Sequence, residues 1–278
     1  MIDLLGELED ELARSAPPVA AALRPGLARD RIDTLLAQLP QPIPEEVRTL
    51  YSWHDGTDEV QGAYRAEIYR GGMFLPLEEA LANRAGGMEG AAGYWDERWL
   101  PLFTDEHAQF DAVVCGVDGG QIVSFSYVDL PDFDVEYRSM GDFVRSLLRR
   151  WQLGVYSMNE WGGVHLDRRA LGALRREEDG DEPDVPALVR SLCDGGETEW
   201  LAALVRLRTR LYPTAVPALI EMLLDPTAGR RTYAAEVLGV IGGAAAADAL
   251  RRTAETDHDE LVRRMAAIAL RDMETIGQ

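Results

Sequence analysis

The first part of the chain combines two hydrophobic periodicities. Residues 2–14 repeat leucine and isoleucine at helical spacing, which predicts an amphipathic helix. Short apolar runs follow, and Asp118-Gly119-Gly120 between two of them is a strong hairpin signal. The expected strands cover residues 66–69, 73–75, 99–103, 112–117 and 121–127. Together these patterns predict an α+β domain with a mixed or antiparallel sheet over residues 1–176.

The pattern changes in the last third of the chain. Residues 177–186 are nearly all acidic, glycine or proline, which predicts a linker. After it, the segment Val185–Asp194 recurs as Val216–Asp225 and, more weakly, as Ala247–Thr256. One small packing residue per unit also recurs in a second helix, at Ala203, Ala234 and Ala266. Residues 187–278 therefore resemble three short HEAT repeats, an all-α stack that presents binding surfaces.

Residues 39–56 combine three sequence signals in a short stretch. Several prolines fix an extended approach, and Pro44 can begin a helix whose first turn carries Glu45 and Glu46. Asp55-Gly56 then ends that helix with turn chemistry. A proline-started helix that ends in aromatic-x-x-Asx-Gly resembles the opening signature of the SUKH superfamily. This is the fold of a fungal cell-wall-synthesis regulator and of many bacterial immunity proteins.

Further segments resemble SUKH motifs in the same order. They are a strand ending in Phe-Leu-Pro-Leu with a helix after it (72–83), a Trp-Pro strand (99–103), a central hairpin (110–127) and a closing helix (140–149). The chain departs from the pattern in its Asp-Gly pair, where Asn-Gly is commoner, and in the loop at Asp105 and Glu106, which lacks the usual Gly-Asp pair. The resemblance implies a SUKH-like first domain that binds and neutralises a toxin.

The charge of the chain is distributed unevenly. The chain has 48 acidic and 28 basic residues, a net charge of −20, and every basic residue is an arginine. Residues 1–160 have 28 acids and 13 arginines, hence −15, whereas residues 161–278 have 20 and 15, hence −5. Such a field attracts basic proteins and repels nucleic acid and anionic membranes, although acidity can also serve solubility alone.

Signals for catalysis and metal binding are weak. No histidine stands at metal-ligand spacing with another histidine or a cysteine, and no nucleophile elbow, zinc-protease motif or phosphate loop occurs. His54 beside Asp55 could form half of an acid–base pair, but a histidine at a helix end next to a turn aspartate is more often structural. Asp132 and Asp134 lack the further oxygen ligands of a calcium loop. We therefore expect no enzyme activity, no cofactor and no metal.

Nucleic acid and membranes are also disfavoured as partners. Arginine pairs recur on the repeats, at 230–231, 251–252 and 263–264, yet acids lie beside each pair, so bridges between repeats are favoured over phosphate contacts. The cysteines lack a disulfide spacing, the N-terminus is acidic where an export signal is basic, and no apolar run approaches the length of a membrane span. These features predict a cytoplasmic protein, and the net charge of −20 favours a monomer or a small oligomer.

The candidate partner-binding residues are acids and aromatics of the first domain. Carboxylates around an aromatic anchor suit the capture of a basic protein surface. Trp95, in a Gly-flanked polar loop, is the expected anchor, whereas Trp53 and Trp99 are expected in the core. The full set is Asp55, Asp58, Glu59, Trp95, Asp96, Glu97, Asp105, Glu106, Asp132, Phe133 and Asp134.

Three functional hypotheses follow. The leading one is an immunity protein that occludes the active site of a toxin, a basic nuclease-type effector or another cationic protein. The alternative is a non-enzymatic regulatory scaffold or adaptor whose HEAT-like repeats bind the main partner. The third is an enzyme with a carboxylate site, for instance a hydrolase that uses His54 and Asp55.

Overall fold

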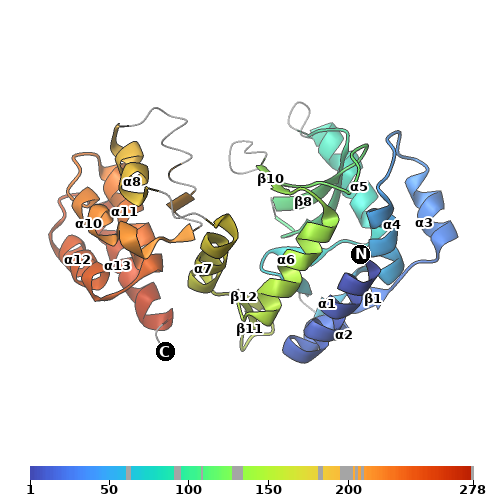
Figure 1. The fold of residues 1–278 in the computed structure, drawn as a ribbon, viewed down its shortest axis with the longest axis horizontal. Coiled ribbons are helices and arrows are strands. Elements are labelled where there is room, and N and C mark those ends of the chain that lie inside the picture. The colour runs from blue at the N-terminus through green and yellow to red at the C-terminus, as the bar shows by residue number, and fades with distance from the viewer. Residues whose placement is uncertain are drawn as a thin grey trace. The chain divides into compact units, whose positions relative to one another are not determined.

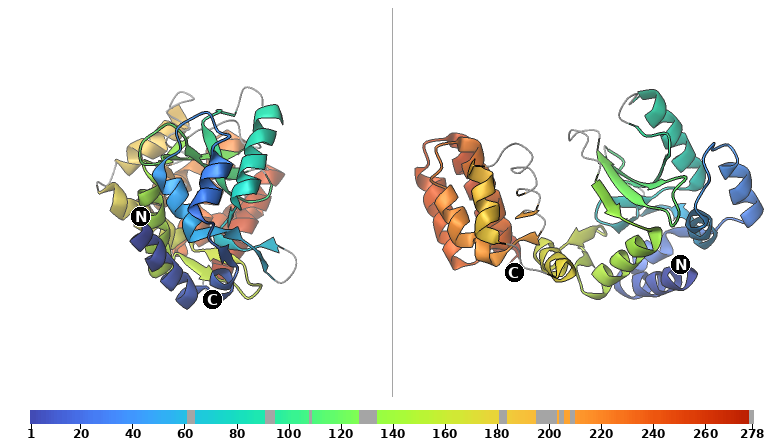
Figure 2. Two further views of the ribbon diagram at one scale, coloured as in Figure 1. Left: turned by 90° about the vertical axis from the view of Figure 1, so that its right-hand side faces the viewer. Right: turned by 45° about the horizontal axis from the view of Figure 1, so that its top comes forward.

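The computed structural model describes residues 1–60, 64–90, 95–107, 109–126, 134–180, 184–194, 203, 206–207 and 210–276. The chain divides into two compact units, Met1–Leu166 and Asp167–Gln278. The first unit combines a sheet with helices, and the second consists mainly of helices (Figure 1, Figure 2). Both parts of the expected fold class are therefore confirmed: an α+β region with an antiparallel sheet, followed by helical repeats.

A six-stranded antiparallel sheet organises the first unit. Its strands lie in chain order, β10-β9-β8-β7-β6-β5, so each pairs with its neighbour in sequence. Their bounds are β5 (Glu67–Tyr69), β6 (Gly72–Phe74), β7 (Trp99–Thr104), β8 (Gln109–Val114), β9 (Ile122–Ser126) and β10 (Asp134–Tyr137). The Asp118-Gly119-Gly120 signal lies, as expected, between β8 and β9, where both glycines have positive φ.

Three two-stranded ribbons accompany this sheet. They are formed by β1 (Leu23–Pro25) with β2 (His54–Thr57), β3 (Glu59–Val60) with β4 (Tyr64–Arg65), and β11 (Tyr156–Met158) with β12 (Val164–Leu166).

The main core of the first unit lies between the sheet and the helices of this unit. The helices of this unit are α1 (Ile2–Ser15), α2 (Pro17–Ala21), α3 (Arg29–Leu36), α4 (Glu45–Trp53), α5 (Leu77–Gly90) and α6 (Met140–Gln152). The predicted stripe of α1 is buried at Leu5, Leu8 and Leu12, and α1 packs against α4 and α6. The Ser139 hydroxyl caps α6 by accepting the N–H of Asp142. A smaller aromatic cluster around Trp99 and Phe125 forms a second apolar group on the sheet.

The second unit is a stack of helical hairpins. Its elements are α7 (Arg168–Asp179), α8 (Val185–Asp194), the 3₁₀ turn η1 (Pro213–Ala215), α10 (Val216–Met222), α11 (Ala228–Ile241), α12 (Ala244–Thr256) and α13 (Glu260–Ile276). Helix α11 packs against α10 and α13, and α12 packs against α13. The three alanines predicted to let the helices approach, Ala203, Ala234 and Ala266, are all buried.

Helix α7 belongs to the second unit. Arg169 Nε donates to the Val240 carbonyl at 2.8 Å, and Arg176 Nη1 donates to the Leu211 carbonyl at 2.8 Å. The division between the units therefore precedes α7, whereas the sequence pattern predicts that the first domain continues to residue 176, which lies within this helix. Of the expected linker 177–186, the first three residues end α7 and Val185 begins α8, while residues 181–183 lie outside the described part.

Candidate functional site

The carboxylates of two expected binding residues, Asp55 and Asp105, accept backbone N–H groups within the first unit. Asp55 is only 8% exposed, and its Oδ1 accepts the N–H of Leu77, the first residue of α5, at 2.9 Å. Asp105 Oδ1 accepts the N–H groups of His107 and Gln109, at 2.8 and 2.9 Å, in the turn between β7 and β8. Both side chains therefore shape the fold at their positions.

Trp95 packs against the smaller aromatic cluster on the sheet, and two acids follow it in the chain. The Trp95 ring packs edge-on against Trp99, Phe110 and Phe125, with centroids 5.6–5.9 Å apart, and is half-buried there. Hydrogen bonds from the Arg98 side chain lower the pKa of Asp96. Glu97 remains exposed. The expected anchor thus contributes much of its ring surface to the aromatic cluster.

The remaining described acids lie near two arginines. Asp58 is exposed and lies 3.7 Å from Arg24, while Glu59 on β3 is the register partner of Arg65 on β4. The Arg65 guanidinium binds Glu79 through two hydrogen bonds, at 2.8 and 3.0 Å, and its Nε lies 3.6 Å from Glu106.

The last three predicted residues fall at the edge of the described chain. Asp132 and Phe133 lie outside the described residues. Asp134 begins β10, where its backbone pairs with Ser124, but its side chain is not described.

A groove of about 630 Å³ in the first unit contains a residue that the sequence patterns did not indicate. Trp161 lines this groove and is 79% exposed, the second most exposed of the large hydrophobic side chains that the structure describes. Among its other lining residues are Arg65, Glu67, Arg70, Asp105, His107, Gln109 and Asn159. The missed signal is Trp161-Gly162-Gly163 in a polar stretch, the same kind of Gly-flanked aromatic that suggested Trp95.

The second unit has a groove of its own, of about 470 Å³, lined by residues of α8 and α10. Its apolar lining includes Val189 and Met222, and its charged residues are Arg190, Glu221 and Asp225. Leu224 lies at the end of this groove with 86% of its surface exposed. An apolar residue this exposed on the rim of a groove is a candidate contact for a partner.

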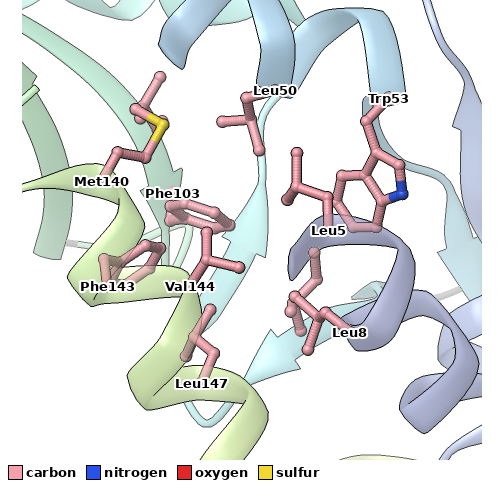
Figure 3. A pocket seen from close by; sticks show the side chains of 11 residues that line it. Leu5, Leu8, Leu50, Trp53, Phe103, Met140, Phe143, Val144 and Leu147 are labelled. Atoms are coloured by element: carbon pink, nitrogen blue, oxygen red, sulfur yellow. The ribbon is translucent and has the colours of Figure 1, made fainter. Parts of the chain in front are cut away.

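The first unit also contains a small void in its core. It measures about 10 Å³ and is lined only by apolar side chains of α1, α4, α6 and the sheet (Figure 3). A void of this size with no polar lining holds neither a ligand nor a stable water. It therefore belongs to the core.

The proposed His54–Asp55 acid–base pair is not assembled. His54 Nδ1 lies 2.6 Å from the Arg24 carbonyl, and its Nε2 lies 3.4 Å from Glu9, whereas Asp55 accepts from Leu77. The two neighbours thus bind different partners. Among the described residues, no group of three or more histidine, cysteine, aspartate or glutamate side chains is placed to hold a metal ion. Nor does the described part of the chain contain a helix with the length and apolarity to span a membrane.

Comparison with known proteins adds one similarity. Residues 199–271 match HEAT repeats, in agreement with the repeats expected from the sequence, and the match leaves the first unit outside it. None of the curated protein sequences matches the chain. HEAT repeats stack into extended surfaces that bind other proteins, so the second unit is similar to a protein-interaction scaffold.

Proposed function

We propose that this protein is a non-enzymatic scaffold that holds a protein partner on its HEAT-like repeats. The observation that carries the proposal is the groove along α8 and α10, with Leu224 exposed at its rim. The apolar side chains of this groove would receive an apolar segment of the partner. Of its charged lining residues, Asp225 is already paired with Arg230 at 3.3 Å, whereas Glu221 is exposed and favours a segment that also carries a basic residue.

A more specific form of the proposal concerns the partner's identity. The partner is a cationic toxin, and the chain acts as an immunity protein that covers the toxin's active site. The SUKH-like order of motifs in the first unit supports this form, as does the charge of −15 on residues 1–160, which would speed association with a basic protein. The first unit would then contact the toxin, and the repeats would extend the interface.

Co-expression of the full-length protein with a toxin tests both forms of the proposal. The toxin-like gene encoded beside this protein is expressed with wild-type protein, with Leu224→Glu, or with Leu261→Glu. Leu261 is a matched control because it is also an exposed leucine of the second unit and does not line the groove. Growth of the cells reports neutralisation, and co-purification with calorimetry reports the affinity of the complex.

The two forms of the proposal predict different results. An immunity protein restores growth and forms a stable complex; a lethal toxin that kills equally with or without the protein contradicts this form. Docking on the repeats predicts at least a tenfold loss of affinity for Leu224→Glu, because a buried charge would replace an apolar contact. Equal affinities of Leu224→Glu and Leu261→Glu would reject the groove as the docking surface.

A further inference from the structure

Trp161 is held outward by the β11–β12 hairpin of the first unit. The two strands pair in regular register from Tyr156↔Leu166 to Met158↔Val164, and the turn between them carries the tryptophan. With 79% of its surface exposed, the ring gains little from burial in the folded monomer. Tryptophan is the residue most enriched among those that dominate binding at protein interfaces, so this exposure points to an external contact.

The turn that presents Trp161 is fixed by its own hydrogen bonds. Asn159 Oδ1 accepts the N–H groups of Trp161 and Gly163, at 3.0 and 2.9 Å, and the Asn159 N–H donates to the Gly163 carbonyl at 2.9 Å. Gly162 takes a φ of 81°, which glycine adopts without strain. The loop is thereby ordered before any partner arrives, which lowers the entropy cost of binding.

The groove beside Trp161 contains a carboxylate oxygen that lacks a hydrogen bond. The Glu67 side chain is 13% exposed, and its Oε1 has only a long contact of 3.4 Å with Arg70 Nη1. Its Oε2 is buried and has no hydrogen-bond partner among the described residues. An unmet carboxylate oxygen of this kind costs free energy that a donor from a partner would recover.

The charges around the groove favour a cation as that donor. Arg65 is already bound by Glu79 and approached by Glu106, so its charge is more than balanced. Arg70 is largely exposed and can turn away from Glu67 toward solvent. The unit around the groove is strongly acidic, with 28 acids and 13 arginines in residues 1–166. Nucleic acid and a second copy of this acidic chain would both be repelled.

We propose that this groove binds an arginine side chain in a basic segment of a partner protein. The Glu67 carboxylate receives the guanidinium, and the Trp161 ring covers its planar face. Arginine fits better than lysine because its flat fork can pair with a carboxylate and stack on an indole at the same time. The inference rests on the proposed function in one respect, namely that the partner is a protein.

A capped tripeptide tests the site without any knowledge of the partner. Acetyl-Gly-Arg-Gly-amide is titrated into the full-length, ¹⁵N-labelled protein, and the indole N–H signal of Trp161 is followed by NMR after assignment with Trp161→Phe. The same peptide with citrulline in place of arginine keeps the shape and removes the charge. We expect a saturable shift of the Trp161 signal with the arginine peptide and at least tenfold weaker binding of the citrulline peptide.

Two charge variants then separate the groove from the general acidity. Glu67→Gln should weaken binding of the arginine peptide about tenfold, because it removes the charge that pairs with the guanidinium. Glu7→Gln makes the same change of net charge on the exposed surface of α1 and should leave the affinity unchanged. Thermal unfolding of each variant verifies that it folds.

Each outcome bears on the proposal. A Trp161 signal that does not move, an equal response to the citrulline peptide, or equal weakening by Glu67→Gln and Glu7→Gln would overturn it. If the arginine peptide binds as described while no toxin is neutralised, the groove stands and the immunity proposal falls. If a toxin is neutralised and Trp161→Ala binds it as tightly as wild type, the groove falls and the immunity proposal stands.

Discussion

Arg231 and Asp257 form a buried two-point ion pair between consecutive helical repeats. Arg231 Nε and Nη2 donate to the two carboxylate oxygens at 2.8 and 3.0 Å, and the side chains are 3% and 8% exposed. Arg231 Nη1 donates in addition to the Asp225 carbonyl at 2.8 Å. One guanidinium therefore ties the loop before its own helix to the corresponding loop of the next repeat.

The same local geometry recurs in the next repeat. Arg263 Nη1 donates to the Asp257 carbonyl at 2.8 Å, six residues before it, as Arg231 does to Asp225. Asp225 and Asp257 each also accept the N–H of the residue two positions later, Thr227 and Asp259. An aspartate that shapes the loop and an arginine six residues later thus recur in both repeats, at the loop where neighbouring repeats are joined.

Removing the carboxylate of this ion pair should destabilise the second unit strongly. Asp257→Asn leaves the buried Arg231 charge unpaired, which costs about 3–5 kcal/mol. Burial raises the pKa of Asp257, but hydrogen bonds from Arg231 and the Asp259 N–H outweigh it, so the pKa lies below its ordinary value. The stability that these interactions contribute is fully present above the pKa of Asp257 in the unfolded chain. It is lost as the pH falls through the lower pKa of Asp257 in the folded chain.

Urea unfolding between pH 7 and pH 3 measures both effects. The control is Asp248→Asn, whose partner Arg251 is exposed and whose loss should cost less than about 1 kcal/mol. If Asp257→Asn were as stable as this control, the ion pair would not be the joint between the repeats.

Two glycines of α11 should respond to alanine in opposite ways. A Cβ at Gly239 would lie 2.6 Å from the Cβ of Ala269 on α13, so Gly239→Ala would force the helices apart, at about 1–3 kcal/mol. Gly229 has nothing within 4 Å of such a Cβ, so Gly229→Ala should stabilise the helix by about 0.5–1 kcal/mol. Thermal unfolding of the two variants measures the difference, and a stable Gly239→Ala protein would contradict the close contact.

The repeats and the hairpin of the sheet could be predicted because their signals are local. Val185–Asp194 and Val216–Asp225 share six of their ten residues, and Asp118-Gly119-Gly120 needs no distant contact to form a turn. The assignment of α7 could not be predicted in this way. Its partners, the carbonyls of Leu211 and Val240, lie far along the chain, and no periodicity within α7 indicates them.

The candidate site shows the same limit. Trp95 and Trp161 both lie within two residues of a glycine in polar stretches, so the sequence offers no reason to prefer one. They differ in the structure because β7, β8 and β9 bring Trp99, Phe110 and Phe125 against the Trp95 ring, whereas the β11–β12 turn leaves Trp161 exposed. Likewise, the sequence predicts Asp55 as a binding residue, whereas in the structure α5 places the N–H of Leu77 beside its carboxylate. Exposure is decided by tertiary contacts between distant segments.

Substitution of Asp55 and of Asp58 by alanine should distinguish a residue that stabilises the fold from one that is free to bind a partner. Asp55→Ala removes the acceptor of the buried Leu77 N–H and should lower the free energy of unfolding by about 1–2 kcal/mol. Asp58→Ala changes an exposed side chain and should change it by less than about 0.5 kcal/mol. Urea unfolding measures both. An Asp55→Ala protein as stable as Asp58→Ala would show that the contact with α5 contributes nothing.

The single buried cysteine that the structure describes should make the protein sensitive to alkali. Burial raises the pKa of the Cys115 thiol from 9.0 to about 11, and the nearby positive charge of Arg84 opposes this only weakly. Between these two pH values the unfolded chain loses the proton while the folded chain keeps it. The free energy of unfolding should therefore be intact below pH 9 and fall by up to about 2–3 kcal/mol as the pH rises toward 11.

Comparison with Cys115→Ala isolates this contribution. Tyr51 and Tyr69, whose pKa values burial also raises, are present in both proteins, so their effect cancels in the difference. Urea unfolding of both proteins under reducing conditions from pH 8 to pH 10.5 should show a steeper loss of stability for wild type. Alanine also removes a sulfur atom from the core, but this loss of packing lowers stability equally at every pH and so does not contribute to the difference in slope. Parallel curves would mean that the thiol ionises as freely in the folded chain as in the unfolded one.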